Sequence, residues 1–309
     1  MADGRIVKHR ALLARGSMNT YKLSGRLTVI GVVASIVAGL AAGLPLAFIY
    51  AWGIIRIPEV KLASITTLAY GAALGGAMAF GARWGKVRNA KVGAALAIAC
   101  AAASLYCSWA FWVKDVFHTF AHQELSASGL MQNPHALWKL IKYVNQYGTW
   151  GMSSGSATKG TELWVIWGLE AAVVLGTAAL AAVTVLRLQP FCENCRLWCT
   201  ATEKLCLLPV SDVAQTKLLL QQHDLSFLQK LGAGDKKTTN LSAELHSCPN
   251  CHELNTLTLR QTFIQPRKFG SPAVKVVTLA TQLLVSRLEA DTFRQTAQGM
   301  KQLSRAAHV

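Results

Sequence analysis

Charged residues are scarce in this sequence. Asp, Glu, Lys and Arg make up 15% of its 309 residues, whereas a typical soluble domain carries about 25%. Acidic residues are the rarer kind, with 15 Asp and Glu against 31 Lys and Arg. Long apolar runs separate the charges in the earlier part of the chain. This distribution excludes an ordinary soluble protein and indicates membrane spans.

The sequence also lacks the short motifs that identify common enzymes. G-x-S-x-G, H-E-x-x-H, P-loop and acidic metal motifs are all missing. We therefore predict no catalytic residue, and a membrane-associated enzyme is the third of our readings of function.

Four apolar segments are long enough to cross a bilayer as helices. A helix needs about 20 apolar residues to span the hydrocarbon core, and Pro45 predicts a kink in the first segment. We predict an all-α membrane domain over residues 27–186, with the lipid bilayer as its surroundings. The four spans of this transmembrane bundle comprise residues 27–55, 63–82, 92–113 and 163–186.

Basic residues predict the orientation of these spans. Lys and Arg are concentrated in residues 1–26, in the 83–91 connection and after Leu186. Because short basic segments are retained on the cytoplasmic side, we predict that both termini are cytoplasmic. Residues 1–26 then form a basic cytosolic segment, and residues 114–162 lie outside.

Glycines four residues apart suggest close helix packing. Such spacing lets helix backbones approach each other in lipid. The pairs are Gly39 with Gly43 and Gly71 with Gly75. They can allow packing within one bundle or the formation of a homo-oligomer.

Glu170 is the acidic residue inside a predicted span. A carboxyl group in the membrane is costly and marks a candidate functional site. It would support the second reading of function, a transporter or channel component. The alternative is a structural role with a hydrogen bond to Tyr106, Ser104 or Ser108.

The 114–162 segment contains a predicted amphipathic helix. Asn133 followed by Pro134 is typical of a helix start, and Leu137, Ile141 and Val144 then fall on one face. We predict that this helix lies on the outer leaflet. His118 and His122, one helical turn apart, form a weak outer metal candidate, and solvated histidines are the alternative.

Two C-x2-C motifs lie in residues 187–309. Cys192 with Cys195, and Cys248 with Cys251, have the spacing of zinc knuckles, in which each tight turn presents two thiolates to one ion. We predict one structural zinc ion per chain. An iron–sulfur cluster or a redox dithiol remains an alternative, and a reducing cytosol disfavours disulfides. Substitute ligands are Cys199, Cys206, His246 and His252.

The rest of this region predicts a small α+β, zinc-ribbon-like cytosolic domain. Residues 211–231 and 288–306 have helical patterns, whereas residues 255–259 and 273–284 have strand patterns. The metal would stabilise a core that is small by itself.

Three short motifs resemble a group of uncharacterised bacterial polytopic membrane proteins with a C-terminal zinc-ribbon-like domain. They are Tyr21-Lys22-Leu23-Ser24-Gly25, Gly85-Lys86-Val87-Arg88-Asn89 and Phe191-Cys192-Glu193-Asn194-Cys195. The resemblance implies a bacterial inner (cytoplasmic) membrane but no activity. It also makes Met18 an alternative start to Met1.

The first reading of function is a membrane-anchored interaction or scaffold protein with a cytosolic protein partner. A closed four-sulfur zinc site leaves no coordination position for catalysis. Nucleic-acid binding is disfavoured because Arg260, Arg267, Lys268 and Lys275 are scattered rather than clustered.

Overall fold

The computed structural model describes residues 19–57, 59–149, 157–235, 238–265 and 271–306. The chain divides into two compact units. Residues 24–188 form the helical unit, and residues 19–23 together with the chain from Gln189 form the sheet unit. The alternative start at Met18 lies outside the described residues.

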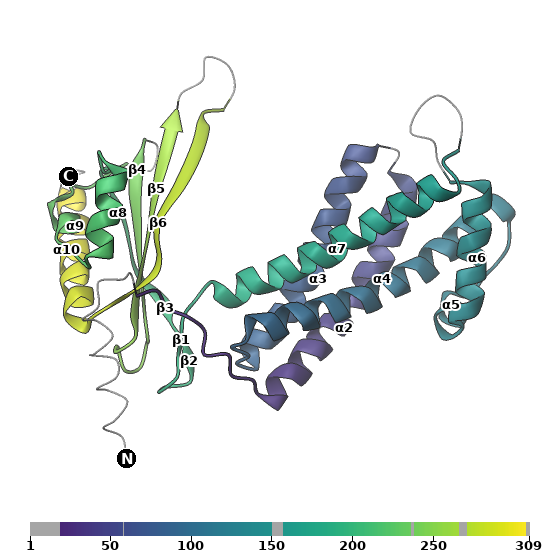
Figure 1. Ribbon diagram of the computed structural model, residues 1–309, viewed down its shortest axis with the longest axis horizontal. Coiled ribbons are helices and arrows are strands. Elements are labelled where there is room, and N and C mark those ends of the chain that lie inside the picture. The colour runs from purple at the N-terminus through teal and green to yellow at the C-terminus, as the bar shows by residue number, and fades with distance from the viewer. Residues whose placement is uncertain (1–18, 58, 150–156, 236–237, 266–270, 307–309) are drawn as a thin grey trace. The chain divides into compact units, whose positions relative to one another are not determined.

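The helical unit contains four long helices, α2 (Val29–Arg56), α3 (Val60–Trp84), α4 (Ala90–Ala121) and α7 (Thr161–Arg187) (Figure 1). All four are long and apolar enough to cross a membrane, as predicted. Helices α2 and α7 each pack against α3 and α4. Pro45 lies inside α2, which continues on both sides of it. Helix α4 runs beyond the predicted end of the third span to Ala121.

The predicted glycine pairs lie at contacts between these helices. Gly39 and Gly43 face Cys100 and Ser104 of α4, respectively. A Cβ atom added at Gly75 would lie 2.1 Å from the backbone oxygen of Ala178 in α7. The glycines therefore allow close packing within one chain, and a homo-oligomer that uses them stays a prediction.

Two shorter helices connect α4 to α7. They are α5 (Ala127–Gln132) and α6 (Pro134–Tyr147), and Asn133 caps α6 as predicted, accepting a hydrogen bond from the backbone of Ala136 at 3.0 Å. The apolar face of α6 is buried in a cluster with residues of α4 and α7, and its members Leu137, Ile141 and Val144 are at most 7% exposed. The chain's own helices therefore cover this face, and the position of α6 on the outer leaflet stays a prediction.

The sheet unit is built on four antiparallel strands in the order β3-β4-β5-β6. Three helices lie on one face of the sheet, and leucines such as Leu207, Leu241 and Leu257 fill the core between them (Figure 1). The predicted 211–231 helix is two shorter helices, and β3 and β4 had no sequence prediction. The elements are β3 (Thr200–Leu207), β4 (Asn240–Ser247), β5 (Asn255–Gln265), β6 (Ala273–Val285), α8 (Val213–Gln221), α9 (Phe227–Lys230) and α10 (Arg287–Ala306).

Residues 19–23 belong to the sheet unit rather than to a separate N-terminal segment. The amide of Tyr21 donates to the carbonyl of Gln282 at 2.8 Å, and the amide of Leu284 donates to the carbonyl of Asn19 at 2.8 Å. This short stretch uses the free edge of β6, whose backbone groups would otherwise be unpaired there. Hydrophobic patterning does not reveal such an addition.

Candidate metal centre

Each C-x2-C motif lies at the tip of an antiparallel hairpin. The first joins β1 (Phe191–Cys192) to β2 (Leu197–Trp198), and the second follows β4 and leads into β5. The residue directly after each motif has a left-handed backbone, with φ of 55° at Arg196 and 54° at His252. This conformation is uncommon outside glycine and turns the chain sharply. The two motifs thus form similar turns.

The two turns bring the four predicted cysteines together. The sulfurs of Cys192, Cys195, Cys248 and Cys251 all lie within 4.8 Å of one another, and they form the one group of three or more metal-ligand side chains among the described residues. The sulfurs of Cys192 and Cys251 are 3.7 Å apart. Metal–sulfur bonds of about 2.3 Å in a tetrahedron separate the sulfurs by about 3.8 Å, whereas a disulfide bond is about 2.05 Å. The cluster therefore has the size of a metal site, with free thiols.

The surroundings of the thiols differ between the two motifs. Burial raises the pKa of Cys192 to about 12. Burial also acts to raise the pKa of Cys248, but hydrogen bonds from the backbone amides of Cys251 and Asn250 outweigh it and lower that pKa to about 7. The side-chain amide of Asn250 also donates to the sulfur of Cys195 at 3.5 Å. A metal that binds here must displace protons, because metal-bound cysteine is a thiolate.

A hydrogen-bond network from α10 supports the second turn. Arg294 donates through Nη2 to Oγ of Ser247 at 2.7 Å and to Oδ1 of Asn255 at 3.3 Å. Asn255 in turn donates to the carbonyl of His252 at 2.9 Å. Sequence analysis missed this support because Arg294 lies far from the cysteines along the chain. Hydrogen bonds around a metal site commonly orient its ligands.

The predicted substitute ligands occupy different places. Cys199 is fully buried beside the four cysteines, where burial raises its pKa to about 12. Cys206 pairs with Ser242 along the sheet. The Nε2 atom of His246 lies 3.6 Å from Glu244, and burial lowers the pKa of His246. Only Cys199 is therefore packed against the cluster, and His252 contributes the backbone turn described above.

Glu170 has a hydrogen-bond partner other than those predicted. The hydroxyl of Tyr50 in α2 donates to Oε1 of Glu170 and also lies 3.0 Å from the hydroxyl of Thr67 in α3. The Tyr50 ring stacks on that of Tyr70, with centroids 4.3 Å apart. The predicted partners bond elsewhere: Tyr106 donates to Met131, Ser104 to Gly43 and Ser108 to Leu105.

The weak histidine candidate lies at the end of α4. The Nε2 atom of His118 is 3.3 Å from Glu124, and both side chains are exposed. His122 ends the helix in a left-handed conformation. Among the described residues, His118, His122 and Glu124 do not form a close group of three metal-ligand side chains.

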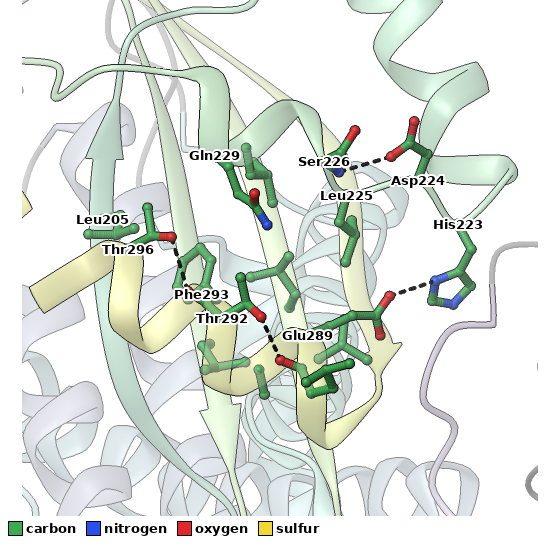
Figure 2. A pocket seen from close by; sticks show the side chains of 16 residues that line it. Leu205, His223, Asp224, Leu225, Ser226, Gln229, Glu289, Thr292, Phe293 and Thr296 are labelled. Atoms are coloured by element: carbon green, nitrogen blue, oxygen red, sulfur yellow. Dashed lines mark hydrogen bonds and ion pairs between the residues drawn. The ribbon is translucent and has the colours of Figure 1, made fainter. Parts of the chain in front are cut away.

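A hollow of about 310 Å³ lies between α9 and α10, over leucines of the sheet (Figure 2). At one side, Nδ1 of His223 faces Oε1 of Glu289 at 3.7 Å. The Nε2 atom of His223 is buried and has no hydrogen-bond partner among the described residues. Beside it, the backbone amide of Ser226 donates to Oδ1 of Asp224 at 2.9 Å.

Comparison of the chain with known protein families, with curated proteins and with solved structures finds no match. Function is therefore inferred from the chemistry of these sites. A shell of four sulfurs can hold a metal ion and stabilise the turns around it, but it has no open position for a substrate.

Proposed function

We propose that the chain is a membrane-anchored interaction protein of a bacterial inner membrane. Four helices anchor it, and Cys192, Cys195, Cys248 and Cys251 hold one structural zinc ion in a cytosolic domain that binds a protein partner. The sulfur separation of 3.7 Å carries this proposal, because it fits a closed tetrahedral site. Metal analysis separates zinc from an iron–sulfur cluster.

The pairing of residues 19–21 with β6 supports the orientation. This segment directly precedes α2, and β6 belongs to the domain that follows α7. Hydrogen bonds between them support a topology in which residues 19–21 and β6 lie on the same side of the membrane, as expected for four spans. The basic residues near these segments favour the cytosol for that side.

The orientation can be tested with single cysteines in a chain that lacks the native ones. An impermeant thiol reagent added to intact cells should label position 128 but not positions 89 and 242, which lie in the α3–α4 connection and in β4. Opening the membrane should expose both protected positions. Labelling of position 89 in intact cells would reverse the orientation.

The hollow between α9 and α10 is the place where we expect the partner to bind. Its leucine floor suits an apolar side chain, and His223 and Glu289 add polar groups at one side. The partner therefore supplies an apolar side chain that enters the hollow.

Affinity purification from membranes in mild detergent tests this function with two matched variants. Thr292→Phe fills the hollow, whereas Gln295→Phe adds the same ring to an exposed position of the same helix. A true partner should be lost from the first variant and retained by the second, with equal zinc content in both. Equal retention would exclude the hollow as the binding place.

A transporter or channel component is the second candidate, because Glu170 lies within a membrane-length helix. That function predicts a bound solute that is lost in Glu170→Gln. The bond from Tyr50 gives the carboxyl a partner within the bundle, which favours a structural role.

A further inference from the structure

The helical unit contains a second hollow, of about 340 Å³, between α4, α6 and α7. Four indole rings and a glycine are prominent in its lining, and we call it the tryptophan pocket. These residues are Trp109, Trp138, Trp164, Trp167 and Gly168.

The rings of this pocket hold one another in place. Trp167 makes edge-to-face contacts with Trp109 and Trp164, at centroid distances of 4.9 and 5.2 Å. Trp138 of α6 lies 5.2 Å from Trp164. Such contacts stabilise aromatic clusters beyond the burial of area. The walls are thus formed before any ligand enters.

Gly168 keeps one side of the pocket open. A Cβ atom there would have no heavy atom within 4 Å, in contrast to Gly75, where the neighbouring helix is in close contact. Close helix packing therefore does not account for Gly168. The glycine is present although alanine would be more favourable inside a helix. Its effect is to leave space beside the indole rings.

The chemistry of the lining selects an apolar occupant. The lining is mainly aromatic and aliphatic carbon, and the Tyr106 hydroxyl already donates to the carbonyl of Met131 at 2.8 Å. Trp164 and Gly168 lie in the first turns of α7, which begins at Thr161, and tryptophan favours this depth near a membrane interface. Lys142 adds a cation 5.9 Å from the centre of the Trp138 ring.

We propose that the tryptophan pocket binds one acyl chain of a phospholipid from the adjacent leaflet, with the phosphate group near the Lys142 ammonium. This inference rests on the proposed insertion of the helical unit in a membrane. The bilayer surrounding the protein supplies the ligand, and the opening at Gly168 admits the chain.

The test compares Gly168→Leu with Gly176→Leu. Both positions lie on α7 and have open space around the missing Cβ, but only position 168 lines the pocket. Each chain is purified from membranes, exchanged into a second detergent, and analysed for retained phospholipid by mass spectrometry. Each buried methylene is worth about fourfold in binding, so exclusion of two or more should lower retention by about tenfold or more.

We expect the wild type and Gly176→Leu to retain phospholipid and Gly168→Leu to lose it, with similar thermal stability in all three. Equal retention by the two variants, or no phospholipid in the wild type, overturns the site. Lys142→Gln should weaken retention more than Lys139→Gln, and equal effects overturn the phosphate contact. Extraction of the wild type by alkaline carbonate would instead show that the membrane anchor itself is wrong.

Discussion

The helical unit and the sheet unit differ in how their apolar side chains are distributed. In the helical unit, Val29, Ile30 and Phe80 are 72–82% exposed, and small residues such as Ala97 and Ala182 occupy buried positions beside larger ones. In the sheet unit, leucines fill the core. Exposed large apolar side chains and small residues at helix contacts are expected where lipid replaces water, because close packing rather than hydrophobic burial then joins the helices. The proposed membrane insertion would therefore give the two units different sources of stability.

The difference between the two units is tested most strongly by Cys248→Ser, which should affect the sheet unit alone. Loss of one thiolate leaves an incomplete metal shell, and apparent zinc contributions in small finger peptides are about 10–16 kcal/mol. We expect this variant to lose its metal and the sheet unit to become sensitive to protease, while the four helices stay in the membrane. Elemental analysis and limited proteolysis measure the two effects.

Cys206→Ser is the control for this change. Cys206 lies in β3, outside the group of four sulfurs, so the metal should be retained. Full metal content in Cys248→Ser would mean that the four-cysteine site is wrong. A wild-type protein without metal would have the same consequence.

The helical unit should instead respond to single methyl groups at its contacts. Gly75→Ala places a Cβ atom 2.1 Å from the carbonyl oxygen of Ala178, so the backbones must separate. We expect a loss of about 3 kcal/mol in the free energy of unfolding in detergent, the upper end of typical overpacking costs. Gly76→Ala meets no atom within 4 Å and should be neutral or stabilising by about 0.5–1 kcal/mol. A similar loss from both changes would contradict close packing at Gly75.

In the sheet unit, Arg294→Ala should weaken the second metal turn without removing a ligand. Hydrogen bonds to charged groups contribute about 1.5–3 kcal/mol, and we expect a loss of about 2 kcal/mol with a faster release of metal to a chelator. Arg287→Ala, at the start of the same helix, removes an exposed ion pair with Glu253 and should cost about 0–1 kcal/mol. Equal metal release from the two variants would show that Arg294 does not support the metal turn.

The smallest expected effect belongs to Glu170. Glu170→Gln keeps an acceptor for the Tyr50 hydroxyl, whereas Glu170→Leu removes it, and hydrogen bonds between membrane helices average about 0.6 kcal/mol. We expect Leu to lower stability in detergent by about this amount, and Gln to stay near the wild type. Tyr50→Phe is the matched change on the other side of the bond, and its cost should not add to that of Glu170→Leu. A more stable Glu170→Leu protein would show that the carboxyl group is costly and retained for an activity.

The elements that the sequence predicted well are those with strong local patterns. Long apolar runs indicate helices whatever their neighbours, and the Asn133-Pro134 start of α6 depends only on local backbone chemistry. Patterns do not show which element covers an apolar face. The apolar face of α6 packs against α4 and α7, which its own sequence does not indicate. A hydrophobic face indicates that it will be buried, but it does not indicate which element or solvent will cover it.

The candidate metal site was also predicted only in part. Spacing alone selected Cys192, Cys195, Cys248 and Cys251, because two residues between cysteines suit one tight turn around an ion. Spacing could not place Cys199 beside the cluster, nor bring Arg294 to the base of the second turn. These contacts depend on how β4, β5 and α10 pack, which involves residues far apart in the chain.

By itself, the sequence determined that the chain has four membrane-length helices and two cysteine turns, because helix length and turn geometry are local properties. Tertiary structure decided the partner of Glu170, the pairing of residues 19–21 with β6, and the two hollows. Each of these depends on the distance between separate elements. That distance is set by the side chains packed between the elements, and no local pattern records it.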